Sequence, residues 1–250
     1  MNGLRARHDY VLRWLRERQP DVVGLQELKM RDELFPAAAF EAAGYHALVH
    51  GQKAWNGVAI LSRDKAALRQ TGLPGQEGLG ARLLTAEVAG LSFTTVYVPN
   101  GKNLEHRDFQ RKLAWLDALA EHFRGCHAPT APTILCGDFN VVPAAIDTWS
   151  EDRLGGTIFH SEPERRRFAY FADWGLSDLF RHLHPGERVF SWWDYRALSF
   201  PRNRGLRIDF LLGTAPIVDR LESVRVDRDY RKKKDGLTAS DHAPVIADLN

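Results

Sequence analysis

The stretch Pro132-Thr-Ile-Leu-Cys-Gly-Asp-Phe-Asn140 carries an apolar run directly into a carboxylate, Asp138, and an amide, Asn140. Such a run predicts a buried strand whose end bears polar groups. Successive side chains of an extended chain point to opposite faces, so Asp138 and Asn140, two residues apart, are expected to project to the same side. There the two side chains could meet one phosphate or one water molecule.

Two other apolar segments have the same design. Glu27 closes the run Asp21-Val-Val-Gly-Leu-Gln, and Asp241-His242 stand immediately before Ala243-Pro-Val-Ile-Ala-Asp-Leu249. A single acid at a strand end is most often a solvated cap, but several at corresponding positions indicate one shared polar site. The candidate oxygen ligands of that site are Glu27, Asp138, Asn140, Asp209 and Asp241.

These oxygen donors, with no thiolate among them, favour Mg²⁺ or Mn²⁺, hard cations that keep several waters and take ligands from substrate phosphates. Among 10 histidines, His242 is distinctive because it follows an acid and opens an apolar strand. Its imidazole could bind a phosphate or shuttle a proton. The combination indicates a metal-dependent phosphoesterase. Ser240 offers the alternative of a serine nucleophile, but it lacks the G-x-S-x-G context.

The overall composition is that of a soluble globular protein. With 250 residues, 44% of them hydrophobic and 26% charged, the chain is expected to form a single domain over residues 1–250. A net charge of +2 neither requires nor excludes a polyanionic partner. Two cysteines exclude a disulfide framework and fit a reducing compartment. No apolar stretch approaches membrane-spanning length, so we expect a cytoplasmic protein without membrane contact.

The pattern of elements predicts an α/β sandwich. Apolar periodicity predicts helices over residues 8–18, 104–123 and 163–174. Turn signals at Asn56-Gly57 and Ala89-Gly90 predict strands beside them, and further strands are expected at 205–212 and at the C-terminus. Antiparallel hairpins mixed with helices favour two packed sheets with the helices outside.

The order and approximate spacing of seven blocks resemble those of the exodeoxyribonuclease III family, over nearly the whole chain. The blocks are Asn2-Gly-Leu-Arg-Ala6, Val22-Val-Gly-Leu-Gln-Glu27, Tyr97-Val-Pro-Asn-Gly101, Gly137-Asp-Phe-Asn140, Phe190-Ser-Trp-Trp-Asp-Tyr195, Arg204-Gly-Leu-Arg-Ile-Asp209 and Ser240-Asp-His-Ala-Pro244. The resemblance implies a four-layered α/β sandwich, a divalent metal (Mg²⁺ or Mn²⁺) and hydrolysis of DNA phosphodiesters.

The resemblance also implies a role for each polar residue. Asp138 would orient or deprotonate the attacking water, and Asn140 would hold that aspartate and the phosphate. Tyr97 would contact the scissile phosphate, with Asn100 supporting it, and Asp209 would pair with His242. The implied catalytic residues are therefore Tyr97, Asp138, Asn140, Asp209 and His242. The implied metal ligands are Glu27, as the principal carboxylate, with Asp138, Asn140 and Asp241.

DNA recognition is expected from two further sets of residues. Trp192, Trp193, Leu206 and Ile208 match the region where the family forms an apolar pocket for a flipped-out baseless sugar. Asn100 and the cationic side chains of Arg5, Lys102, Arg204 and Arg207 are expected to contact flanking phosphates. The alternatives are ordinary ones: adjacent tryptophans often pack in a core, and lone arginines are often ion-paired.

The resulting expectation is a monomeric DNA-repair nuclease acting on duplex DNA, as an abasic-site endonuclease and a 3′–5′ exonuclease that also cleans 3′ ends. One alternative is a related phosphoesterase of lipid or inositol phosphates. The other is a DNA-binding relative with weakened catalysis, because family members carry a short strand with a metal-associated asparagine just before the block that begins here at Asn2. We therefore expect a chain shortened at its N-terminus, with unpaired backbone groups in the strands that would flank the missing one.

Overall fold

The predicted strand that carries Asp138 is an inner strand of a six-stranded sheet in the computed structural model, which describes residues 2–250. The sheet has the order β4-β5-β6-β7-β9-β8, and only β6 and β7 pair in parallel. Its strands are β4 (Ala67–Thr71), β5 (Leu83–Val88), β6 (Leu91–Tyr97), β7 (Thr133–Asp138), β8 (Ser177–Asp178) and β9 (Asp209–Gly213).

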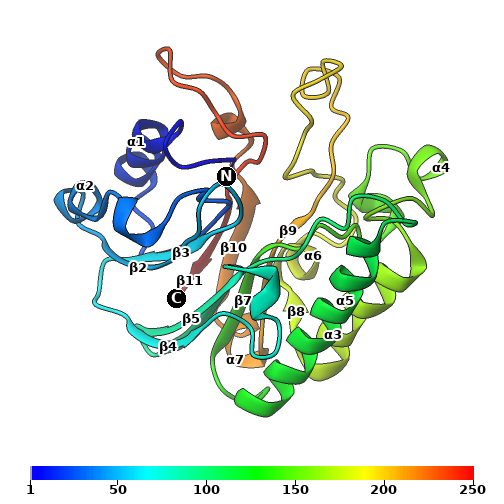
Figure 1. Cartoon of the computed structure of the whole chain (residues 1–250), viewed down its shortest axis with the longest axis horizontal. Coiled ribbons are helices and arrows are strands. Elements are labelled where there is room, and N and C mark those ends of the chain that lie inside the picture. The colour runs from blue at the N-terminus through cyan, green and yellow to red at the C-terminus, as the bar shows by residue number, and fades with distance from the viewer. Residues whose placement is uncertain (1) are drawn as a thin grey trace.

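A second layer of strands packs against one face of this sheet (Figure 1). It consists of a three-stranded sheet of order β1-β3-β2 and a two-stranded sheet of β10 and β11. The strands are β1 (Val22–Gln26), β2 (His46–His50), β3 (Val58–Ser62), β10 (Leu221–Val226) and β11 (Val245–Leu249). Apolar side chains of β3, β5, β6 and β7 fill the space between the layers.

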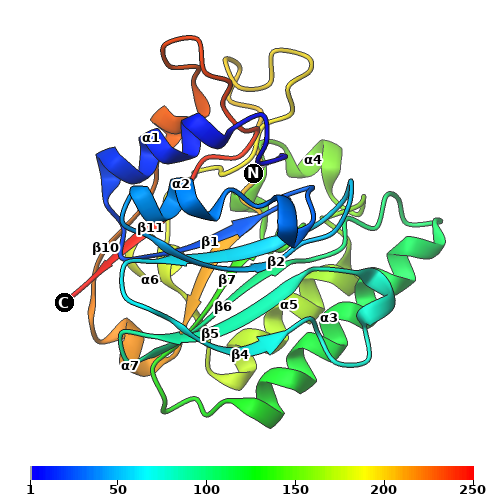
Figure 2. The same ribbon diagram turned by 60° about the vertical axis from the view of Figure 1, so that its left-hand side comes forward.

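Helices form the two outer layers (Figure 2). Helices α1 (His8–Arg18) and α2 (Ala37–Ala42) cover the three-stranded sheet, whereas α3 (Arg107–Cys126) and α5 (Glu162–Trp174) cover the six-stranded sheet. The predicted four-layered α/β sandwich is confirmed. Among the described residues, no helix combines the length and the apolar character that crossing a membrane requires. Short helices complete the fold: α4 (Glu151–Leu154), α6 (Leu179–Leu183) and α7 (Ala215–Val218).

The local predictions hold with small shifts at the ends of elements. The Ala89-Gly90 turn has φ values of 49° and 76°, the left-handed pair that joins strands in a tight hairpin. The strand expected over 205–212 begins only at Asp209, because Leu206 exchanges backbone hydrogen bonds with Trp192 instead of with β7. This detour places Leu206 and Trp192 side by side.

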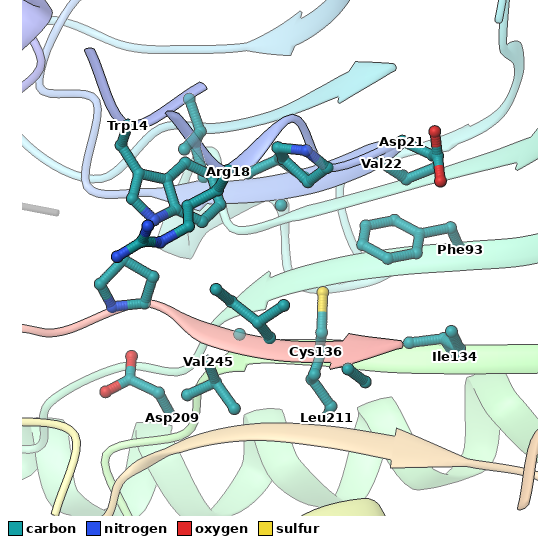
Figure 3. A pocket seen from close by; sticks show the side chains of 18 of the residues that line it. Trp14, Arg18, Asp21, Val22, Phe93, Ile134, Cys136, Asp209, Leu211 and Val245 are labelled. Carbon is teal, nitrogen blue, oxygen red and sulfur yellow. The ribbon is translucent and has the colours of Figure 1, made fainter. Parts of the chain in front are cut away.

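A slot separates the facing edges of β1 and β11 (Figure 3). β1 pairs with β3 and β11 pairs with β10, and no strand formed by residues 2–250 lies between them. The slot has a volume of about 470 Å³. Its lining is mainly apolar, and one end reaches the polar side chains of Asp209, Ser240 and His242.

The first described residues lie in line with this slot. The backbone N–H groups of Gly3 and Leu4 donate to the carbonyl oxygens of Glu27 (2.9 Å) and Leu28 (3.0 Å). The two segments run in the same direction, so residues 3–4 lie parallel to residues 27–28, which continue the chain after β1. The slot lies along the same edge of β1.

Fusing a segment of 5 alternating apolar and polar residues, the length of β1, directly before Asn2 is expected to stabilise the protein. The segment would lie between β1 and β11, form hydrogen bonds to their facing edges and bury apolar side chains in the slot. The Tm should rise by about 2–4 °C for each kcal/mol gained, as measured by calorimetry. A Gly/Ser segment of equal length is the control. Equal Tm values for the two fusions would show that the slot does not accept a strand.

Candidate active site

Three strand ends bring the predicted catalytic side chains to one edge of the six-stranded sheet. Tyr97, at the end of β6, is in register with Asp138, at the end of β7. Asp209, at the start of antiparallel β9, is in register with Asp138 on the other side. The parallel pairing of β6 with β7 and the antiparallel pairing of β7 with β9 therefore make the three residues neighbours in one row.

His242 reaches this row from the loop before β11. Its Nδ1 lies 2.9 Å from Asp209 Oδ2, and its Nε2 lies 3.9 Å from Asp138 Oδ2. The predicted pairing of Asp209 with His242 is therefore present. Ser191 fixes the aspartate, because its hydroxyl donates to Asp209 Oδ2 at 2.6 Å. With Nδ1 held by Asp209, the imidazole directs Nε2 toward Asp138.

The protonation states of this group follow from burial and neighbouring charge. Burial raises the pKa of Asp138 to about 7; His242 opposes this shift, whereas Asp209 and Glu27 add to it. Burial acts to lower the pKa of His242, but Asp209, Asp138 and Asp241 outweigh it and raise that pKa to about 9. At neutral pH the site thus holds an imidazolium beside a carboxyl group that readily exchanges its proton.

Glu27 lies on the other side of Tyr97. The hydroxyl of Tyr97 donates to Glu27 Oε1, and burial, followed by the charge of Glu27, raises the pKa of Tyr97 well above its ordinary value. Tyr97 is therefore a neutral hydrogen-bond donor at physiological pH. Lys29 Nζ lies 3.5 Å from Glu27 Oε2 and donates to Asn2 Oδ1 at 2.6 Å.

Asp241 is buried and held by neutral donors. Its Oδ2 accepts from Trp192 Nε1 at 3.2 Å and from Asn2 Nδ2 at 3.5 Å. Although burial acts to raise the pKa of Asp241, the charge of His242 and the Trp192 hydrogen bond help to hold it below the ordinary value. Ser240 is part of the same turn: its hydroxyl donates to Asp241 and accepts from the His242 backbone N–H. Ser240 therefore has a structural role in this turn.

The donor set fits a hard divalent cation. Ligand atoms of Asp138, Asp209 and His242 lie within 4.8 Å of one another, but His242 could bind a cation only without its proton, and Glu27 and Asp241 do not belong to this group. The raised pKa of Asp138 reflects the burial of negative charge next to other acids, which a divalent cation would offset. Glu27 and Asp241 are linked to each other through Lys29 and Asn2. Oxygen donors from several loops are typical of Mg²⁺ and Mn²⁺ sites.

Asn140 does not continue the strand that ends at Asp138, so the side-chain alternation behind the prediction of a shared face is absent. The strand ends at Asp138, and Asn140 adopts a left-handed conformation with φ of 49°, so the alternation of side chains stops. The backbone N–H of Asn140 donates to Asp138 Oδ1 at 2.9 Å, and its side-chain amide donates to the Val98 carbonyl at 2.9 Å. Asn140 therefore braces the Asp138 carboxylate and the chain that follows β6.

An apolar cluster adjoins the polar row. Leu206 and Ile208 are buried with Val142, and the half-buried Trp192 packs against them. The indole N–H of Trp192 at the same time reaches Asp241. Trp193 does not belong to this cluster, contrary to the prediction: it is fully buried and packs edge-on against Phe200 in a separate cluster. Adjacent residues on an extended chain face opposite ways, which explains the division.

The predicted phosphate contacts also divide. Arg207 is only 2% exposed, and its guanidinium donates to Asp147 Oδ1 and Asp178 Oδ2, each at 2.7 Å. This arginine is fixed inside the protein, so its predicted contact with DNA is wrong. Arg5, Asn100 and Lys102 are exposed, and Arg204 is half-buried over the Trp149 ring.

The structure adds cationic residues that the sequence reasoning missed. A hollow beside the N-terminal loop is lined by Arg5 together with Lys29, Arg31 and Lys53. Lys29 follows the Glu27 block by two residues, so its nearness to the site could have been inferred from position. Lys53 belongs to the loop that pairs with residues 28–29 through Asn56 and Gly57. That long-range pairing carries no local sequence signal.

Comparison with known proteins gives consistent matches over the whole chain. Residues 1–242 match the family model described as "Endonuclease/Exonuclease/phosphatase family". The exodeoxyribonuclease III of Haemophilus influenzae is 35% identical over 263 residues, covering 100% of this chain and 97% of that protein.

Solved structures agree. An AP endonuclease from Archaeoglobus fulgidus superimposes with a TM-score of 0.95 at 33% identity, covering 100% of this chain and 96% of that one. A 3′ phosphatase from Neisseria, NExo, bound to a product DNA hairpin, gives a TM-score of 0.93 at 36% identity, with the same coverage.

The His242–Asp209 pair is expected to make stability depend on pH. Because the pKa of His242 is raised from 6.5 to about 9, the stabilisation is fully present below pH 6.5 and is lost as pH rises through 9. In metal-free buffer the Tm of the wild type should exceed that of Asp209→Asn at pH 6, and the gap should narrow by pH 10. Asp152→Asn, an exposed change, is the control. A gap of constant size would show that the pair does not titrate as a unit.

Proposed function

The chain belongs to the endonuclease/exonuclease/phosphatase family, and we propose that it hydrolyses phosphodiesters of duplex DNA at abasic sites and at 3′ ends, with Mg²⁺ or Mn²⁺. The observation that carries the proposal is the juxtaposition of the Asp138–His242–Asp209 row with the half-buried Trp192, which packs on the apolar cluster around Leu206. The row supplies hydrolytic chemistry, and the exposed part of Trp192 supplies an apolar contact for a sugar without a base.

The side chains of the row fit in-line attack of water on a phosphorus atom. Asp138, with a pKa near 7, can accept the proton of the attacking water at neutral pH. His242, held as an imidazolium by Asp209, can donate to a phosphate oxygen as negative charge develops there. Tyr97 remains neutral and adds a second donor beside Glu27. Asn140 keeps the Asp138 carboxylate in place.

The proposed metal ligands are carboxylates around the same row. Glu27 and Asp241 would hold the cation together with Asp138, with Asn140 near them, and Asn2 lies within hydrogen-bonding distance of Asp241. A bound divalent cation supplies positive charge that polarises the phosphate. Excess negative charge at Asp138 is the feature of this chain that supports such a site.

Recognition of the abasic site is assigned to Trp192 and the apolar cluster beneath it. A baseless nucleotide is the easiest to extrude from a duplex because no base pair has to be broken. The half-buried Trp192 would contact the extruded sugar, and the buried Leu206 and Ile208 support its ring from below. The similar structures described as an AP endonuclease and as a 3′ phosphatase bound to DNA support this substrate class.

Exposed cations and amides next to the site are proposed to contact flanking phosphates. Arg5, Lys102 and Arg204 take this role, with Asn100 beside Lys102. Lys102 forms an ion pair with Asp108. Because the lysine side chain is exposed, breaking this ion pair to bind a phosphate costs little free energy. We further propose that the protein acts as a cytoplasmic monomer and folds as a single domain.

Asp138→Asn and His242→Asn are each expected to lower turnover by roughly 10²- to 10⁴-fold, because each removes a proton acceptor or donor from the chemical step. DNA affinity should change little. Single-turnover cleavage of an abasic duplex with and without Mg²⁺ measures the first effect, and Asp152→Asn controls for nonspecific loss. Near-wild-type turnover of either variant would remove that residue from the mechanism.

The same assay separates the alternative functions. Cleavage of inositol or lipid phosphates in preference to abasic DNA would support a related phosphoesterase. Tight DNA binding without metal-dependent cleavage by the wild type would support a binding protein with weakened catalysis.

Trp192→Ala is expected to lower abasic-site incision by about 10-fold, from the loss of roughly 1.4 kcal/mol of contact in the transition state, while binding to intact duplex is unchanged. The reason is that, among parts of the DNA, Trp192 would contact an extruded sugar and not a paired nucleotide. Incision rates on abasic duplex and affinity for intact duplex are the two measurements. Equal losses in both would assign Trp192 to a general DNA contact.

A further inference from the structure

A buried ion pair lies directly behind the active site. Lys112 of α3 and Glu164 of α5 form a salt bridge, and both side chains are 0% exposed. Lys112 interrupts the apolar stripe of α3, which otherwise packs on the six-stranded sheet. Burying two charges is costly, and apolar side chains of similar volume often stabilise a protein as well or better. We therefore expect the ion pair to have a role other than packing.

Lys112 uses its donors on the two loops that leave the catalytic strands. Its Nζ donates to the Asn140 carbonyl at 2.5 Å and to the Asn100 carbonyl at 3.4 Å, in addition to Glu164. Asn140 follows Asp138 and β7, and Asn100 follows Tyr97 and β6. One ammonium group thus ties together the backbone beside Asp138 and the backbone beside Tyr97.

Glu164 extends the same network to the apolar cluster around Leu206. Its Oε1 accepts from the Phe159 N–H at 3.1 Å, and its Oε2 accepts from the Ser161 N–H at 3.1 Å and hydroxyl at 2.6 Å. The second oxygen closes the capping box at the start of α5. Phe159 packs against the apolar cluster of Val142, Leu206 and Ile208, and its carbonyl accepts from the Val142 N–H. The ion pair is therefore shared by the phosphate side and the sugar side of the site.

The conformation of Asn140 explains why such a tie is needed. The left-handed conformation of Asn140 costs free energy, although less for asparagine than for most residues, and hydrogen bonds from its surroundings hold it. Asn140 is held by its own amide on Val98 and by Lys112 on its carbonyl oxygen. Without Lys112 that buried carbonyl would lose a charged donor, and the peptide that braces Asp138 would be free to rotate.

We propose that Lys112 and Glu164 are positioning residues. Their buried ion pair fixes the loops after β6 and β7 relative to the apolar cluster around Leu206. The catalytic row and Trp192 are thereby held in alignment. The inference rests on the proposed nuclease function. It assigns no contact with substrate to either residue.

The test compares variants that separate charge balance from donor supply. Lys112→Met combined with Glu164→Gln removes both charges but leaves the Asn140 and Asn100 carbonyls without the ammonium. Glu164→Gln alone keeps the ammonium. Leu119→Ala, a fully buried position two turns further along α3, destabilises the same helix while it leaves the hydrogen-bonding groups of Lys112 and Glu164 unchanged. Turnover and KM for abasic duplex, Tm, and amide hydrogen exchange are measured for each variant.

The double variant is expected to lose roughly 10- to 100-fold in kcat, the scale on which displacing catalytic groups by about 1 Å acts, with KM changed less than threefold. Leu119→Ala, assayed below its own Tm by the same margin, should keep kcat within threefold of the wild type. Exchange at the Asn140, Val142 and Lys102 amides should accelerate at least tenfold in the double variant and not in Leu119→Ala.

Two results would overturn the inference. One is a double variant whose kcat matches that of Leu119→Ala, which would make the ion pair a purely structural element. The other is unchanged exchange at the three amides. Wild-type cleavage of abasic DNA tests the proposed function separately, and the exchange measurement still decides the role of the ion pair if that cleavage is absent.

Discussion

The site depends on a carboxylate that the fold has removed from water. Asp138 ends an inner strand and is 4% exposed, and this burial, with a further contribution from Asp209 and Glu27, raises its pKa to about 7. Keeping several acids together in such a place requires compensating positive charge and hydrogen bonds. His242 supplies the positive charge, and the backbone N–H of Asn140 supplies a direct bond. The same imbalance makes the site suitable for a divalent cation and suitable for activating water.

Sheet topology turns this local problem into a reproducible geometry. Tyr97, Asp138 and Asp209 sit on three adjacent strands in register, so their Cα positions are fixed by backbone hydrogen bonds. The sheet is in turn fixed on both faces: α3 and α5 cover one and the second strand layer covers the other. Groups placed on strand ends in this way can be held with the accuracy that catalysis requires. The flexible parts of recognition are left to the exposed loops.

A site residue could be predicted from the sequence when the residues it contacts are close to it in the chain. Apolar runs that end in acids located Glu27, Asp138 and Asp241, because strand burial and strand ends leave a pattern in consecutive residues. The pairing of Asp209 with His242 came from resemblance to a family and not from any local signal. Arg207 was misassigned because its partners, Asp147 and Asp178, are 60 and 29 residues away.

Adjacent tryptophans posed a related problem. Trp192 and Trp193 must face opposite ways, but the sequence alone does not say which of them packs on the apolar cluster beside the catalytic row. The answer depends on Leu206 pairing with Trp192, a contact between distant segments. Lys112 was likewise invisible, since a lysine in a helix is normally a surface residue. Side chains whose environment is built by tertiary contacts were thus the ones that sequence patterns placed poorly.

The slot between β1 and β11 also bears on how two strand edges are shielded. Strand edges open to solvent can pair with another sheet, which leads to aggregates. Here the two edges face each other across a cavity of about 470 Å³, which Trp14 and Arg18 of α1 also line (Figure 3). A space bounded on both sides can admit one strand but not the edge of an intact neighbouring sheet. The two edges are therefore turned toward the inside of the fold and away from the sheets of other molecules.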